Sequence, residues 1–283
     1  MDFYLNFTLP SSTLKAKVKE LSFKQLRSLN KFISNKDESS ISYAFETILN
    51  ENIHNFSELP PLNNLEKFCI LFLIRMASIS PEIEFKKDLV LRKLNLGTLF
   101  NTLTNKKFIF SREIAKENIK LKLSLPKSLY FNELFNNLYE CLDEIKINND
   151  KIIKVNNLTQ EEKLILYENL PAHVLNELKD HKNFIENQFT EIEFKIDEEN
   201  KIEITPFSHS LFELLKLIYS IDLKTLYDLH FLIVTKLNYS PDYVDSNTLL
   251  ENVILINNYN DEAAKAAEES KKSALDAKNP LNK

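Results

Sequence analysis

The chain has 283 residues, of which 43% are hydrophobic and 27% are charged, and its formal net charge is -5. A chain of this length and composition can build a sizeable core in one large or two modest domains. The acidic balance argues against general binding to nucleic acid, which depends on clustered Lys and Arg side chains. No positively charged leader precedes an apolar stretch at the N-terminus, so we expect no secretory signal and a protein that stays in a cytoplasm.

Glycine and cysteine usage excludes several classes of protein. The single glycine, Gly97, cannot supply the dinucleotide-binding fingerprint, the P-loop or the nucleophile elbow. The two cysteines, Cys69 and Cys141, each fall in an apolar helical pattern, which indicates buried thiols in a reducing compartment and no disulfide framework. An AT-rich genome would also give few glycines and many Lys, Asn and Ile residues, so composition alone does not define the function.

Residues 1–80 are predicted to form an N-terminal unit of one β-hairpin and several helices. Apolar and polar residues alternate on both sides of a turn at residues 10–12, which is the pattern of a half-buried hairpin. Two helical patterns follow, over residues 23–33 and 40–53. The outer face of the second strand carries three lysines: Lys15, Lys17 and Lys19.

The stretch at residues 58–80 predicts a buried helix. Two prolines hold the chain extended, and Asn63 with Glu66 then gives the pattern of a capping box. Residues 68–74 are all apolar, and a helix that is apolar on every side must be buried. This run is too short for a membrane span, which needs roughly 18 to 20 apolar residues.

Arg75 closes the apolar run and is the most unusual charge in the sequence. A guanidinium group at such a place must find a carboxylate, a set of backbone carbonyls or water. We expect a structural ion pair inside the fold. The alternative is that Arg75 marks a protein-binding face.

Residues 81–209 are predicted to form a mixed middle region of short strands and helices. Strands are expected around Ile83 and Phe85 and at residues 108–110, 119–125 and 151–155, and helices at residues 130–145, 159–167 and 172–189. A late hairpin is expected to pair residues 192–196 with 202–204 across a polar turn that contains Asp197 and Asn200.

Residues 210–260 are predicted to form C-terminal helices that pack on the rest, at residues 210–219, 222–237 and 252–259. After Asn260 the composition shifts to Ala, Lys, Glu and Ser. Residues 261–283 are therefore expected to form a flexible polar tail, either disordered or a solvated helix. The predicted fold class is α+β, mainly helical, with short β-hairpins and this tail.

Candidate catalytic and metal-binding residues are few. His173, His181 and His209 lie in or near helical patterns, but a zinc site needs three or four convergent ligands with suitable spacing. Two carboxylate pairs, at residues 161–162 and 198–199, fall at a helix start and in a turn, where acids have structural roles. We expect no catalytic residue, no metal and no cofactor.

Exposed polar segments are the candidates for docking a partner. They are the N-terminal hairpin with Lys15, Lys17 and Lys19, the turn with Asp197 and Asn200, and the tail after residue 260. For the lysines, a second interpretation is a solvated strand face that discourages edge-to-edge aggregation.

Four segments follow one another along the chain. The first two begin at Leu9 and Glu58 and read LPSSTLKAKVKELSFKQLRSL and ELPPLNNLEKFCILFLIRMASIS. The later two read LTQEEKLILYENLP and SLFELLKLIYSIDLKTLYDLHFLIVTKLNYS. In this order they resemble the baseplate hub and hub-assembly proteins of T-even-type contractile-tail bacteriophages. The resemblance extends from Leu9 to about Glu251 as a pattern of weak motifs. Many members of that family carry paired cysteines suggestive of zinc ribbons, whereas the segments around Phe85 and Phe194 have none.

The resemblance implies a viral structural or assembly protein that helps build the central hub of a contractile-tail baseplate. Its partners would be other hub or tail proteins, with an oligomer inside the hub, and it would act by binding and not as an enzyme. It would be found in the host cytoplasm during assembly and in the tail baseplate of the virion.

Two alternatives stay open at this point. The first is an enzyme whose active-site residues are too dispersed to recognise, which a deep pocket with convergent titratable groups would favour. The second is a factor associated with nucleic acid, for which binding that weakens steeply with salt would be diagnostic. The second alternative would use five lysines: Lys15, Lys17, Lys19, Lys106 and Lys107.

Overall fold

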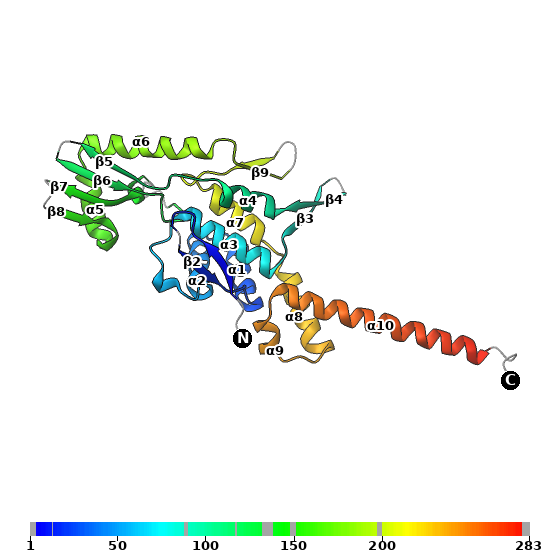
Figure 1. Cartoon of the computed structure of the whole chain (residues 1–283). Helices are drawn as coiled ribbons and strands as arrows, with labels where there is room; N and C mark the ends of the chain where they lie inside the picture. Colours follow the sequence, from blue (N-terminus) through cyan, green and yellow to red (C-terminus); the bar gives the residue numbers. More distant parts are fainter. Residues whose placement is uncertain are drawn as a thin grey trace.

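The fold is α+β and mainly helical, as predicted. The computed structural model describes residues 4–12, 14–87, 90–116, 118–131, 138–147, 151–196 and 200–278. Within this part of the chain, three antiparallel hairpins and one four-stranded antiparallel sheet accompany the helices. Figure 1 shows the four-stranded sheet at one end of the molecule, the N-terminal elements in the middle and the last helix projecting from the opposite end.

The N-terminal hairpin lies against the first helices. Strands β1 (Leu5–Thr8) and β2 (Lys15–Val18) pair with Leu5 opposite Val18, and Ala16 and Val18 are buried while Lys15 and Lys17 face solvent. This alternation is the predicted one. Helices α1 (Phe23–Asn35), α2 (Glu38–Asn52) and α3 (Asn64–Ser78) follow.

The free edge of β2 is covered by the residues that follow α2. The main-chain N–H of Lys19 donates to the Asn52 carbonyl at 2.7 Å, and the N–H of His54 donates to the Lys17 carbonyl at 2.8 Å. The Asn55 side chain completes the edge by accepting from the Lys17 N–H at 2.8 Å. This edge therefore needs no lysine to prevent aggregation.

Helix α3 forms the centre of the core, as its apolar sequence predicts. The Asn63 side chain accepts from the Glu66 N–H at 3.0 Å, and the Glu66 carboxylate accepts from the Asn63 N–H at 3.2 Å, which confirms the capping box. Glu66 also accepts from both the N–H, at 3.2 Å, and the hydroxyl, at 2.5 Å, of Ser11 in the N-terminal turn. One carboxylate therefore joins the helix start to the hairpin.

Among the described residues, Arg75 contacts main-chain carbonyls and not the carboxylate of the expected ion pair. The side chain is only 5% exposed, and its guanidinium donates to the main-chain carbonyls of Ile218 (from Nε, 3.0 Å), Ser80 and Glu82 (from Nη2, 3.4 Å). The chain at residues 79–82 turns away from the end of α3, and its main-chain carbonyls accept the hydrogen bonds that a carboxylate was expected to accept from Arg75. Burial lowers the pKa of Arg75 to about 10, so the group stays charged at neutral pH.

The middle region begins with a hairpin and a helix. Strands β3 (Glu82–Lys87) and β4 (Val90–Asn95) pair antiparallel, and α4 (Leu96–Asn105) follows directly with Asn95 as its N-cap. Helix α4 was not predicted. The predicted strand at residues 108–110 is also wrong: this segment is irregular, and the Gln188 side chain bonds both the N–H and the carbonyl of Ile109, at 2.7 and 3.1 Å.

The four-stranded sheet corrects the end of the predicted helix at residues 130–145: residues 142–145 belong to a strand, whereas residues 132–137 lie outside the described residues. In strand order the sheet consists of β5 (Arg112–Lys116), β6 (Ile119–Leu123), β7 (Leu142–Ile147) and β8 (Lys151–Lys154). The register between β6 and β7 shifts at Lys122 and Leu123, so that Leu142 and Ile145 are both buried although they are three residues apart. A bulge of this kind gives a strand the spacing of a helix.

Two helices and a hairpin follow the sheet. Helix α5 (Gln160–Glu168) begins at a capping box of Thr159 and Glu162, close to the predicted helix start at residue 159. Helix α6 (Ala172–Phe189) lies beside the sheet, where Lys116 and Glu177 form an ion pair at 3.1 Å. Strands β9 (Glu193–Lys195) and β10 (Lys201–Glu203) form the predicted late hairpin.

The last part of the described chain, from residue 210 to residue 278, contains four helices: α7 (Ser210–Tyr219), α8 (Leu223–Lys236), α9 (Pro241–Ser246) and α10 (Leu249–Lys278). Helix α7 packs on α3, where the Tyr219 hydroxyl donates to the Leu71 carbonyl at 2.6 Å. Thr248 and Glu251 form a capping box at the start of α10. Helix α10 continues without a break through the change in composition at residue 260 (Figure 1).

Candidate protein-binding groove

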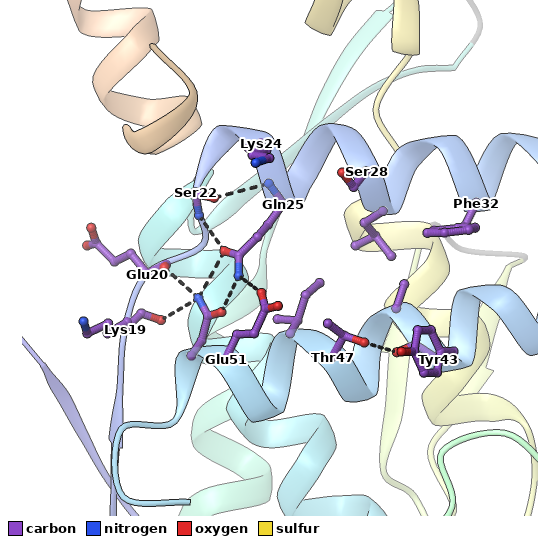
Figure 2. A pocket seen from close by; sticks show the side chains of 14 residues that line it. Lys19, Glu20, Ser22, Lys24, Gln25, Ser28, Phe32, Tyr43, Thr47 and Glu51 are labelled. Carbon is purple, nitrogen blue, oxygen red and sulfur yellow. Dashed lines mark hydrogen bonds between the residues drawn. The ribbon is translucent and has the colours of Figure 1, made fainter. Parts of the chain in front are cut away.

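A hollow on the surface lies between α1 and α2. Its volume is about 610 Å³, and Figure 2 shows the two helices running in opposite directions along its sides. Along α1 the rim consists of Lys24, Ser28 and Phe32, and along α2 it consists of Glu51, Thr47 and Tyr43. Each set has a spacing of four residues, which places its members on one face of the helix.

The groove is polar at the end near the start of α1. The Gln25 amide donates to the Glu51 carboxylate at 2.7 Å and to the Asn52 side chain at 2.8 Å. Asn52 is buried and donates in turn to the Glu20 carbonyl at 2.7 Å. These bonds hold α1 and α2 at a fixed separation. Burial and the nearby Glu251 carboxylate raise the pKa of Glu20.

The opposite end of the groove is aromatic. Phe32 is 37% exposed and Tyr43 is 72% exposed, although both have large rings that favour burial. Between the two ends, the small side chains of Ser28 and Thr47 leave the floor open, and this floor consists of the buried residues Leu29, Ala44 and Ile48. An apolar floor with aromatic and polar ends is the composition of a protein-binding groove.

The chemistry of the groove favours binding over catalysis. The residues that line the groove include no His or Cys. One of its carboxyl groups, that of Glu20, has a raised pKa, and Glu20 lies beside residues that cap helix starts. A nucleophile activated by an adjacent base is therefore not assembled there. Across the described residues, no three His, Cys, Asp or Glu side chains gather in the way that a metal site requires.

The sequence-predicted docking residues lie apart from this groove, except Lys19. Lys15 and Lys17 are exposed on β2, and Lys19 lies at the polar end of the groove with its ammonium 5.4 Å from the centre of the Tyr4 ring. Asp197 lies outside the described residues. Asn200 accepts the Ile196 N–H through its carbonyl at 2.9 Å and so closes the β9–β10 hairpin.

Two other residues considered from the sequence, His181 and Lys106, lie within hydrogen-bond distance of main-chain carbonyls. His181 is fully buried and its Nε2 lies 2.9 Å from the Ser124 carbonyl, and burial lowers its pKa. Lys106 donates to the Gln188 carbonyl at 2.6 Å and lies over the Phe108 ring. Neither residue belongs to a cluster that would bind a metal or a phosphate.

The groove was not predicted from the sequence. The signal that could have revealed it is an aromatic residue at the end of each rim, four residues from a small hydroxyl side chain: Phe32 follows Ser28, and Tyr43 precedes Thr47. Phe32 and Tyr43 interrupt the polar faces of their helices, and exposed aromatic residues of this kind are typical of binding surfaces. Helical periodicity alone cannot show that the two faces are neighbours.

Residues 2–214 match the family described as T4 bacteriophage base plate protein. The match includes the groove and all elements from β1 to the middle of α7. No curated protein and no solved structure matches the chain. Among the described helices, none combines the length and the apolar character needed to span a membrane.

Proposed function

The chain belongs to the T4 bacteriophage base plate protein family, and from this we propose that it acts in the central hub of a contractile-tail baseplate, as a structural or assembly protein. Family membership gives it a structural role in a phage baseplate, with other baseplate proteins as partners and the virion tail as its location. The proposal adds the hub, construction of that hub through binding without catalysis, and assembly in the host cytoplasm before the tail is complete.

The α1–α2 groove is the observation that carries the binding mechanism. It combines a buried apolar floor with two exposed aromatic residues, Phe32 and Tyr43, and a fixed polar end. Surfaces of this kind gain free energy when a partner covers them, because apolar area leaves water while the rim stays hydrogen-bonded. A catalytic pocket would instead bring titratable groups together at short distances.

A second docking surface is proposed on the lysine-bearing face of β2. Lys15 and Lys17 both point to solvent, and the edge beside them is already covered by residues 52–55. Because that edge is already covered, the two exposed lysines are free to bind an acidic surface of another hub protein. The turn at residues 197–200 and the tail after residue 260 are proposed as further docking segments.

Co-expression tests the proposal. The full chain would be produced with each of the other baseplate proteins of the same phage, and complexes would be captured and analysed by size-exclusion chromatography. We expect a stable complex with at least one of them. A chain that elutes alone in every combination would refute a role in the hub.

A pair of charge reversals locates the proposed contact on β2. Lys15→Glu with Lys17→Glu should weaken the complex, whereas Lys120→Glu with Lys122→Glu should not. Lys120 and Lys122 form a matched control, because they are exposed and lie two residues apart on β6. Equal effects of the two pairs would show that net charge, and not the β2 face, governs the interaction.

A further inference from the structure

Helix α10 packs on the body at its start, and the same face is left uncovered farther along the helix. Leu249 and Ile256 pack against the body, and the buried Asn252 side chain donates to the Val244 carbonyl at 3.0 Å. Residues 257–271 are all exposed, and the helix runs on to Lys278. Residues 257–278 extend for about 33 Å at 1.5 Å per residue.

The face that packs on the body continues along the projecting part. Steps of three and four residues lead from Ile256 to Tyr259, Ala263, Ala266 or Ala267, and Ser270. Tyr259 is 44% exposed, and the residues after it on this face are small. A helix with such a face can approach other helices closely, and an isolated helix of this length is only marginally stable in water.

Charges of opposite sign flank this face. On one side lie Glu262 and Glu269, seven residues apart, and on the other side lies Lys271. The α1 and α2 helices carry complementary charges. Lys24 lies on the rim of the groove and Glu51 lies on the α2 side. Lys31 is exposed on α1 beside the rim, seven residues after Lys24, with its ammonium 5.9 Å from the centre of the Tyr227 ring. A separation of seven residues spans about 10 Å on each helix.

We propose that the α1–α2 groove of one copy receives residues 259–271 of α10 from a second copy. The incoming helix runs opposite to α1 and places Tyr259 between Phe32 and Tyr43. In this direction the right-handed helix turns its acidic flank toward α1, where Glu262 faces Lys31 and Glu269 faces Lys24.

The same direction satisfies the remaining contacts. Lys271 comes to the α2 side at the polar end of the groove, where it faces Glu51. The small residues of the helix lie over the floor between Ser28 and Thr47, where a larger side chain would hold the helix away from Leu29 and Ile48.

The occupant must come from another copy, because the chain's own α10 points away from the body (Figure 1). The contact joins two different surfaces, so it is head-to-tail and builds a ring or an open chain of copies. The inference rests on the proposed function only in treating the chain as a binding protein. Self-association is measured on the purified chain and hub binding by co-expression, so either result can fail without the other.

Sedimentation of the purified full chain over a range of concentrations tests the inference. We expect reversible association at low salt. Glu262→Lys with Glu269→Lys should weaken it by about tenfold or more, because like charges then meet across the rim. The matched control is Asp261→Lys with Glu268→Lys, which makes the same change of charge at the same spacing on another face of α10 and should have no effect.

Charge exchange completes the test. Lys24→Glu with Lys31→Glu should also weaken association, and combining all four substitutions in one chain should restore it. A wild-type chain that stays monomeric, equal losses in the control pair, or no restoration in the fourfold variant would each overturn the inference. All the substituted residues are exposed, so the variants retain the core of the fold.

Discussion

The Arg75 guanidinium and the Ile218 carbonyl are joined by a hydrogen bond of 3.0 Å across the contact between α3 and α7. The same group also donates to the Ser80 and Glu82 carbonyls. Arg75 thus fixes the end of one helix to the last turn of another and to the start of β3. A buried charge satisfied by main-chain carbonyls alone depends on backbone geometry more than an ion pair does.

Arg75→Met should destabilise the protein, because it removes three hydrogen bonds and leaves buried carbonyls without a donor. We expect the free energy of unfolding to fall by about 3 kcal/mol. Urea denaturation measures the loss. The stability of Arg75→Lys should lie between that of the wild type and that of Arg75→Met, since a single ammonium cannot reach all three carbonyls as the guanidinium does. A Met variant with wild-type stability would mean that these hydrogen bonds add no net stability.

Glu66 should make stability depend on pH. Burial raises the pKa of this carboxyl group above its ordinary value of 4.5, although hydrogen bonds from Ser11 and Asn63 lower it. The folded state therefore holds the proton to higher pH than the unfolded state, and the free energy of unfolding falls as pH rises from 4.5 through the folded-state pKa.

The test compares wild type with Glu66→Gln by urea denaturation at several pH values. The Gln variant should lack this decrease. Ser11→Ala removes the hydrogen bond that the Ser11 hydroxyl donates to the carboxylate, keeps the one from the main-chain N–H, and should make the decrease larger. Parallel pH profiles for wild type and Glu66→Gln would contradict the assignment.

Local signals predicted much of the helical structure. Capping boxes at Asn63 and Thr159 and the N-cap at Asp222 fix helix starts through contacts within three residues, and such contacts are visible in a sequence. Strand β7 could not be identified in this way. Its two buried residues, Leu142 and Ile145, have helical spacing only because the bulge opposite β6 changes the alternation.

Long-range contacts account for the other differences. The Gln188 side chain takes the place of a neighbouring strand at Ile109, and the carbonyl partners of Arg75 come from residues up to 143 positions away. The groove has the same origin, since Phe32 and Tyr43 become neighbours only when α1 packs on α2. No local pattern contains this information.

Tyr219→Phe should cost about 1 kcal/mol of stability, because the buried hydroxyl donates to the Leu71 carbonyl at 2.6 Å. The ring itself stays in contact with Phe45, so packing is preserved. Tyr43→Phe is the matched control and should leave the free energy of unfolding unchanged, since Tyr43 is largely exposed. Equal losses in the two variants, measured by urea denaturation, would show that the buried hydrogen bond is not the cause.

Asn52→Ala should both destabilise the protein and loosen the polar end of the groove. The Asn52 side chain accepts from Gln25 at 2.8 Å and donates to the Glu20 carbonyl at 2.7 Å, and its removal leaves both groups without this partner. We expect a loss of about 1 to 3 kcal/mol in the free energy of unfolding.

Asn50→Ala controls for the change of residue type on the same helix, because Asn50 is exposed and two residues away. It should be nearly neutral in urea denaturation. Amide hydrogen exchange then separates local from global effects. In Asn52→Ala, protection should fall most at the start of α1 and the end of α2, the two segments that Asn52 joins. A uniform loss across all helices would mean that Asn52 supports the whole fold and not specifically the groove.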